Sequence, residues 1–369
     1  MWSAYLFQTT TGQIGPRLNY ESVDWSIALN DVEDINLRLR KSELPDIDLK
    51  RWLSPWWAGV VLMWNRSPVV AGPIISRPYE NTDFISLGCG GIRSVLTKRF
   101  VVPEFTNWDE LPKYGHLGWK NLSLGTIAKR VVEAAQDKPG GKLPITYALP
   151  DITGIHERNY EGFNVANLSA DDVLVKLSEV TGGPDIMFKP RLLQDSVLTF
   201  DMWTGTDTQP RIYQKHTPIW DVTPVRGSVV DLNFITTGTY ETGRVFAVGT
   251  GQDRGTVIKV ATDPTMVQQQ YPLLETYINY SNSEDPQVVQ GHAKASLEAN
   301  TGPLVEVQMT IRGDGDIPFG EFWPGDLVNV VTKGWLAVPD GITQMRLLSM
   351  SGDSSNNVRV SLQRDDRYT

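Results

Sequence analysis

The chain has 369 residues and a formal net charge of −9, and its only cysteine is Cys89. This length predicts two or three domains, and a single cysteine excludes an intramolecular disulfide framework and a multi-cysteine zinc site. The acidic balance argues against a protein that holds nucleic acid through phosphate contacts. No apolar run approaches the roughly 20 residues of a membrane span, so we expect no membrane anchor.

The N-terminal hundred residues have the pattern of short strands. Ile35, Leu37 and Leu39 alternate with polar residues, which predicts a strand with one buried and one exposed face. Further strands are predicted at residues 59–64, 68–76, 84–88 and 94–102, the first two as a hairpin. Several short strands in this length indicate a small barrel or sandwich over residues 1–105.

The middle of the chain changes to a helical period. From Leu124 onward the apolar residues recur at helical offsets, and Ser123 is placed as the N-cap. A second helix is predicted to begin at Ser169, where Asp172 three residues later resembles a capping box. Strands are predicted at residues 186–188 and 197–203. Together these elements predict an α+β segment over residues 106–215.

The last third returns to period-two alternation, most clearly at residues 305–311. Other strands are predicted at residues 231–235, 244–249, 256–260, 326–331, 344–350 and 357–363. A helical pattern interrupts them near residues 268–300, where Asp285 before Pro286 suits a helix start. We predict a second β-barrel domain over residues 216–369 with this helical insertion.

None of the short patterns has a recognisable catalytic or metal-binding arrangement. The glycine-rich residues 249–251 and 313–316 favour hairpin turns over phosphate or calcium loops. The four histidines show no metal-ligand spacing, and Asp171 and Asp172 are expected to complement a helix dipole. Cys89 lies in a predicted glycine turn without a visible base, so we expect a structural thiol. We predict that the chain is not an enzyme and has no catalytic residue, cofactor or metal.

Tryptophan is abundant, with 12 residues, and Trp52, Trp56 and Trp57 stand close together around Pro55. A loop with three indoles cannot remain fully wet without a large apolar patch, which monomers rarely expose. The rings must therefore pack against their own domain, against a neighbouring subunit or against a sugar. We expect at least one of the three to be buried in a subunit interface.

Several stretches, in their shared order, resemble minor tail proteins of siphophages that infect actinobacteria, of the tail-tip baseplate hub type. These stretches are the tryptophan-rich region with the hairpin at residues 59–75, residues 121–128, residues 182–191 after the second helix, and the turn at residues 323–328. The resemblance covers most of the chain.

The resemblance implies a homotrimer in which each subunit contributes two β-barrel domains related to the tail-tube fold, with an α+β domain between them. Three subunits would present a pseudo-sixfold ring to the tail tube protein or the distal tail protein. Other minor tail proteins and the tape measure protein are further implied partners. Phage DNA would pass through without specific binding, since a negative lumen repels its backbone. The implied location is the tail tip of the virion, after assembly in the host cytoplasm.

A second hypothesis stays open from the residues alone. Tryptophans in a β-rich protein also occur at sugar-binding faces, and the paired carboxylates of a glycosidase leave no local signature. The alternative is a β-rich carbohydrate-binding or glycoside-hydrolysing protein that acts on the host cell wall. Broad subunit interfaces would favour the hub, whereas a cleft with convergent carboxylates would favour the enzyme.

Overall fold

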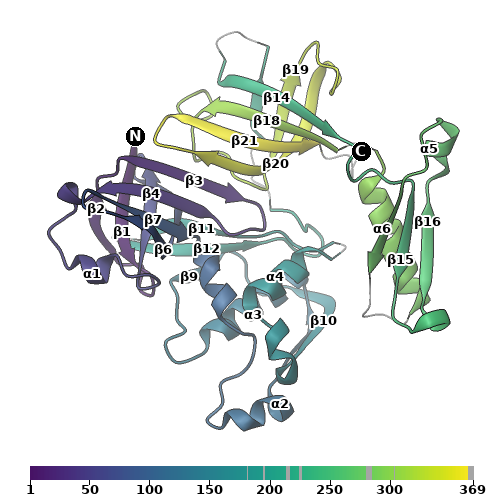
Figure 1. Ribbon diagram of the computed structural model, residues 1–369, viewed down its shortest axis with the longest axis horizontal. Coiled ribbons are helices and arrows are strands. Elements are labelled where there is room, and N and C mark those ends of the chain that lie inside the picture. Colours follow the sequence, from purple (N-terminus) through teal and green to yellow (C-terminus); the bar gives the residue numbers. More distant parts are fainter. Residues whose placement is uncertain are drawn as a thin grey trace. The chain divides into compact units, whose positions relative to one another are not determined.

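The computed structural model describes residues 1–180, 182–193, 196–212, 217–223, 227–279, 285–302 and 304–364. The chain forms two compact units (Figure 1). The first comprises Met1–Leu232, Met309–Gly334 and Pro339–Thr369, and the second comprises Asn233–Gln308 and Trp335–Val338. The second unit is therefore an insertion in the sequence of the first.

The first unit contains most of the strands: β1 (Trp2–Gln8), β2 (Ile14–Leu18), β3 (Ser22–Ala28), β4 (Asp34–Arg40), β5 (Ala58–Trp64), β6 (Ser67–Glu80), β7 (Phe84–Gly90), β8 (His116–Leu122), β9 (Ile145–Tyr147), β10 (Thr153–Glu161), β11 (Ile186–Leu193), β12 (Val197–Thr204), β13 (Ile219–Asp221), β19 (Leu327–Thr332), β20 (Gly341–Gly352) and β21 (Asn357–Arg364). Strands β14 (Val229–Thr237) and β18 (Leu304–Arg312) continue into the second unit. The helices of the first unit are α1 (Leu49–Trp52), α2 (Leu111–Tyr114), α3 (Leu124–Gln136) and α4 (Ala170–Ser178), and the 3₁₀ helices are Lys41–Glu43, Ile92–Lys98, Trp108–Glu110 and Gly162–Asn167.

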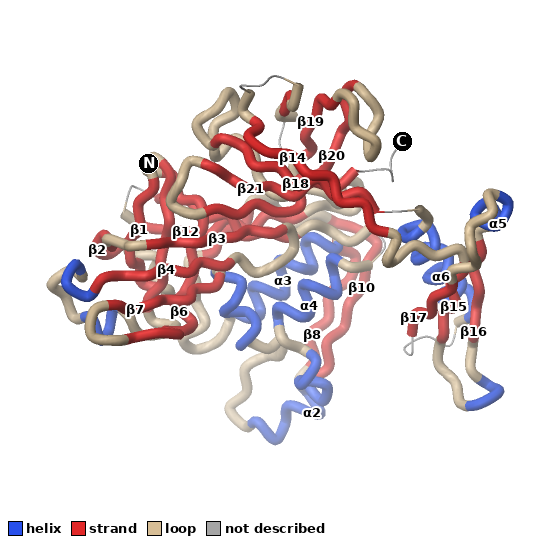
Figure 2. Tube along the Cα trace, turned by 45° about the horizontal axis from the view of Figure 1, so that its top comes forward, coloured by secondary structure: helices blue, strands red, loops and turns tan. Residues whose placement is uncertain are grey.

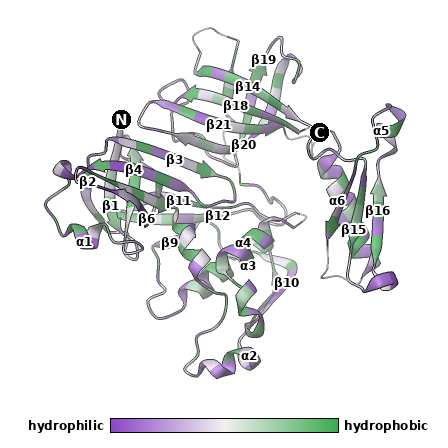
Figure 3. Ribbon diagram, viewed as in Figure 1, coloured by the Kyte–Doolittle hydropathy of each residue, from purple (hydrophilic) through white to green (hydrophobic). Residues whose placement is uncertain are grey.

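One 13-stranded sheet has the order β14-β18-β21-β20-β3-β4-β7-β6-β5-β1-β2, with β19 and β13 branching beside β20. Its N-terminal and C-terminal strands are joined by β3 and β20, which pair antiparallel, with Ala28 opposite Ser349 and Trp25 opposite Gly352. Hydrophilic and hydrophobic residues alternate along strands such as β21, where every second residue is buried (Figure 3). The prediction of a mainly β chain with a central α+β segment is confirmed.

The two separate β-barrels predicted from the sequence are not found. Among the described residues the strand order has two open ends, β2 and β14, and no barrel closes. No barrel closes among these strands because both edges of β20 are already paired with other strands. One edge of β20 pairs with β19 and then with β3, while its other edge pairs with β21. Each β region therefore extends the other's sheet instead of curling onto its own first strand.

A hydrophobic core joins the first two predicted regions. Phe7 of β1 and Val61 of β5 belong to the same buried cluster as Ile127 and Val131 of α3 and Phe200 of β12. The rings of Phe7 and Phe200 lie 6.1 Å apart. Boundaries near residues 105 and 215 stay a prediction about where the chain could be divided.

Local signals placed the main helices correctly. Helix α3 begins after Ser123, whose hydroxyl oxygen accepts a hydrogen bond from the Thr126 N–H at 3.1 Å. Helix α4 begins after Ser169, whose hydroxyl oxygen accepts from the Asp172 N–H at 3.4 Å. The two helices pack beside each other, as Figure 2 shows. Their apolar faces bury one side of the smaller sheet β11-β12-β9.

The strand predicted at residues 94–102 is wrong, because this stretch begins inside the 3₁₀ helix Ile92–Lys98. Two backbone hydrogen bonds of 3₁₀ spacing hold its ends: the Ser94 N–H donates to the Gly91 carbonyl, and the Arg99 N–H donates to the Leu96 carbonyl. Over so short a stretch, the apolar residues of a 3₁₀ helix and those of a strand give similar patterns in the sequence.

The second unit is a small α/β structure. Its sheet has the order β16-β15-β17, from β15 (Arg244–Val248), β16 (Ile258–Thr262) and β17 (Glu275–Asn279), and its helices are α5 (Pro264–Gln268), α6 (Pro286–Asn300) and the 3₁₀ helix Asp253–Gly255. Asp285 caps α6 as predicted, with its carboxylate accepting from the Gln287 N–H at 2.8 Å. The predicted helical stretch from residue 268 is wrong before α6, since β17 lies there. Val289 and Ala293 of α6 are buried with Ala247 of β15 and Ala261 of β16.

Candidate functional site

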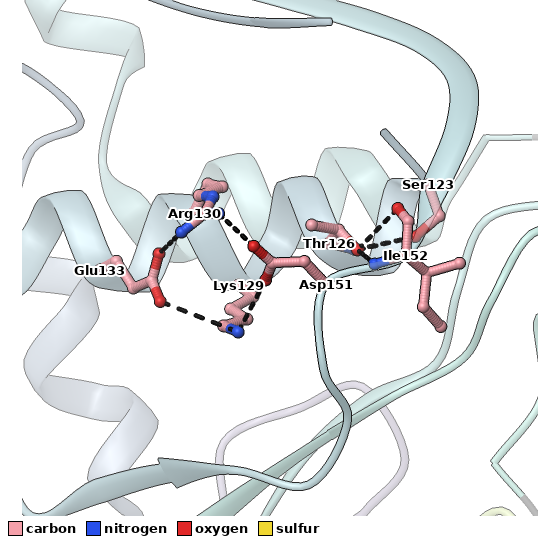
Figure 4. A network of polar contacts seen from close by, with 7 residues as sticks. All are labelled: Ser123, Thr126, Lys129, Arg130, Glu133, Asp151 and Ile152. Carbon is pink, nitrogen blue, oxygen red and sulfur yellow. Dashed lines mark hydrogen bonds and ion pairs between the residues drawn. The ribbon is translucent and has the colours of Figure 1, made fainter. Parts of the chain in front are cut away.

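Helix α3 is tied to the loop before β10 by a network of polar contacts (Figure 4). The Thr126 hydroxyl donates to the Ile152 carbonyl at 3.1 Å, and the Ile152 N–H donates back to the same hydroxyl oxygen at 2.9 Å. Thr126 is buried, so these bonds fix the loop against the first turn of the helix.

The second half of this network is a cluster of ion pairs on the same helix (Figure 4). Lys129 contacts Asp151 at 2.7 Å, and Arg130 contacts both Asp151 and, at 2.5 Å, Glu133. The hydrogen bond from Lys129, with the charge of Arg130, holds the pKa of Asp151 below its usual value. The cluster is half-exposed, so it orients these side chains more than it stabilises the fold.

A fully buried arginine lies at a position that no sequence pattern marks. Arg93 is 2% exposed; its guanidinium contacts the Asp171 carboxylate at 2.5 Å and donates to the Asn30 carbonyl at 2.6 Å. Asp171 was predicted only to complement a helix dipole. In the structure it also neutralises Arg93, which falls just before a stretch with a strand-like pattern. A charge partner so distant in sequence has no local signature.

A buried aromatic cluster contains three of the 12 tryptophans. The ring of Trp2 lies 5.3 Å from Trp25, 5.2 Å from Trp64 and 5.5 Å from Phe319. All four rings are at most 7% exposed. Phe319 follows the glycine-rich residues 313–316, which form a turn within this unit. The cluster therefore packs C-terminal residues against β1, β3 and β5.

The structure brings together two of the three tryptophans predicted at an interface. The rings of Trp52 and Trp57 meet edge to face at 5.3 Å, and the Arg51 guanidinium lies 4.5 Å from the Trp57 ring. A Cβ added to Gly15 of β2 would meet the Trp52 ring at 2.5 Å, so this indole packs on its own sheet. Both side chains are half-buried.

Trp56 differs from its two neighbours. Its side chain is 37% exposed, and its backbone has a φ of 66°, in the left-handed region that bulky residues rarely adopt. Its N–H donates to the Ile74 carbonyl at 2.8 Å, which fixes this conformation against β6. Strained backbone held by its surroundings concentrates at functional positions.

Cys89 lies in β7, not in a turn, where it is opposite Ile35 of β4 and Ile74 of β6. Its side chain is 1% exposed, and burial raises the pKa of the thiol far above its usual value. These surroundings favour a structural role. His216, one of the four histidines, lies outside the described residues, as do Asp365 and Asp366 near the C-terminus.

Within the described ranges, no group of three or more histidine, cysteine or acidic side chains is arranged to hold a metal ion. None of the helices described is both long and apolar enough to cross a membrane.

The fold is similar to that of several solved structures over nearly the whole chain. It is similar to a tail protein from Neisseria meningitidis, with 15% identity and a TM-score of 0.58 over 99% of this chain and 97% of that one. It is also similar to the 43 kDa tail protein of prophage MuSo2 from Shewanella oneidensis, with 11% identity and a TM-score of 0.62 over 99% and 98%. A prophage tail protein from Listeria monocytogenes matches at 8% identity and a TM-score of 0.50, over 99% and 95%.

The chain shares the fold of these tail proteins. No family model matches the sequence, and no curated protein matches it. At 8–15% identity the tail-protein fold is shared through its architecture and not through a recognisable sequence.

Proposed function

We propose that this chain is a structural protein of a phage tail tip: a trimeric hub that joins the tail tube or the distal tail protein to the tip. The observation that carries the proposal is the tail-protein fold, shared over 99% of this chain and 97–98% of two tail proteins. Similarity over nearly all of both chains supports a whole-protein role, since a shared superfold module would match only in part.

The charge supports a channel through which DNA passes without binding. Each chain carries a formal net charge of −9, so a ring of three would carry three times this negative charge. A negative lumen repels the phosphate backbone and lets DNA slide. The siphophage type, the minor tail proteins and the tape measure protein as neighbours follow from the sequence resemblance and belong to the proposal.

The mass of the protein in solution tests whether it is a trimer. We expect light scattering after size-exclusion chromatography to give three times the 41.2 kDa mass of one chain, because obligate ring assemblies bury interfaces in excess of about 2,000 Å². A mass of one chain at every protein concentration tested would contradict the trimeric hub.

Of Trp52, Trp56 and Trp57, only Trp56 is exposed, so we propose that Trp56 lies in the subunit interface. We expect Trp56→Ala to weaken self-association by about 2 kcal/mol, roughly 30-fold in Kd, because exposed indoles act as anchors when a partner buries them. Analytical ultracentrifugation of the variant and the wild type measures the change.

Trp108→Ala is the matched control, since Trp108 is another indole of the first unit and is 50% exposed. Trp52→Ala should act differently and lower the stability of the subunit, because Trp52 packs on its own sheet. A Trp56→Ala variant with the Kd of the wild type would remove Trp56 from the interface.

A further inference from the structure

An open groove of about 600 Å³ runs along helix α3 in the first unit. Trp119 of β8 and Tyr147 of β9 contribute aromatic rings to its lining. Ala134 of α3 contributes a small side chain to the same lining. The ring of Trp119 is held 5.6 Å from Tyr160, and the Tyr147 hydroxyl is 3.2 Å from the Gln136 amide nitrogen. Both rings are therefore fixed by their own chain, and both are half-buried.

The same groove is lined by two cations and two anions, Arg130, Lys142, Glu133 and Asp137, so its formal charge is zero. Arg130 and Glu133 are oriented by the ion pair at 2.5 Å. Asp137 and Lys142 are exposed and make no ion pair with another described residue. Hydrogen-bond donors and acceptors thus stand side by side next to two aromatic rings.

This composition selects among ligand classes. An anion such as a phosphate would need a net positive lining, and an apolar ligand would leave four charged groups desolvated without partners. A neutral polyhydroxylated ligand satisfies both requirements, because each hydroxyl donates and accepts. The C–H bonds on one face of a sugar ring also suit the negative face of an aromatic ring. The volume lies within the range of ligand pockets.

We propose that this groove binds a short neutral oligosaccharide, through Trp119 and Tyr147 with Arg130, Glu133, Asp137 and Lys142. The proposal is one of binding, not of hydrolysis, because the Glu133 carboxylate is held in an ion pair with Arg130. It is independent of the proposed hub, since a tail-tip protein can hold a glycan whether or not it forms a trimer.

Isothermal titration calorimetry with the tetramer of N-acetylglucosamine and with cellotetraose tests the groove. We expect saturable binding of at least one tetramer to the full chain. Ala134→Trp, which fills the groove, is expected to weaken binding at least about tenfold. Asp137→Ala removes an exposed charged acceptor and should cost about tenfold by losing a charge-assisted hydrogen bond.

Trp108→Ala is the control, because Trp108 is an exposed indole that does not line the groove. Its affinity should equal that of the wild type. Absence of binding by both tetramers at millimolar concentration overturns the proposal, and so does binding that survives both Ala134→Trp and Asp137→Ala. Should Ala134→Trp fail to fold, Asp137→Ala decides alone, since its site is exposed. The trimer mass is measured separately and is unaffected by either outcome.

Discussion

Asp185→Asn is expected to lower the free energy of unfolding of the first unit by about 3–5 kcal/mol. Asp185 lies just before β11 and contacts Arg346 of β20, and its carboxylate also accepts from the Ile212 N–H at 2.8 Å. Both charged side chains are nearly buried, at 6% and 11% exposure. Asparagine keeps the shape of the side chain but removes the negative charge that faces the largely buried Arg346 guanidinium.

The pair should contribute little net stability even though breaking it is costly. Burial raises the pKa of Asp185 in spite of the opposing charge of Arg346, which indicates that desolvation outweighs the attraction. Replacing both residues, by Asp185→Asn with Arg346→Met, should therefore recover most of the lost stability. Denaturant unfolding followed by tryptophan fluorescence reports on this unit, which contains all of the 12 tryptophans except Trp335.

An exposed pair serves as the control for this prediction. Arg191 and Asp201 pair at 2.7 Å across β11 and β12, but the Arg191 side chain is 49% exposed. Asp201→Asn should cost no more than about 1 kcal/mol, because water screens the remaining charge. If Asp185→Asn and Asp201→Asn lowered the free energy of unfolding equally, burial of the Asp185–Arg346 pair would not increase the cost of breaking it.

Local structure could be predicted from the sequence where the signal is itself local. Ser123, Ser169 and Asp285 cap helices as expected, because a cap involves backbone groups only two or three residues away. The hairpin of β5 and β6 follows from an apolar run and a turn in which Asn65 and Arg66 both have positive φ.

What the sequence could not predict depends on partners far apart in the chain. Because β3 pairs with β20, the two expected barrels are one sheet. No sequence pattern in either strand indicates that the other strand is its partner. The same holds for Arg93 with Asp171, and for the groove, whose rings come from β8 and β9. Trp119 and Tyr147 have no local pattern that would have marked them as a site.

Glu33→Gln is expected to stabilise the first unit by about 3 kcal/mol above pH 7 and to have little effect near pH 4.5. Glu33 lies in the loop between β3 and β4 with its side chain buried; its Oε2 has no hydrogen-bond partner among the described residues. Burial, which outweighs the nearby charge of Arg93, raises its pKa from 4.5 to about 7, and Asp31 and Asp171 add to the rise.

The sign of the effect follows from proton linkage. The folded chain holds the Glu33 proton more tightly than the unfolded chain, so stability is greatest below pH 4.5 and falls as pH rises toward 7. At about 1.4 kcal/mol per unit of pKa, the full cost is about 3 kcal/mol. Glutamine has nearly the same shape and cannot ionise, so the variant should lose this pH dependence. Denaturant unfolding at pH 5 and pH 8 measures it, with Glu21→Gln as the control, since the Glu21 side chain is 39% exposed. A Glu33→Gln variant that is destabilised equally at both pH values would mean that the glutamate is ionised and that its charge offsets Arg93.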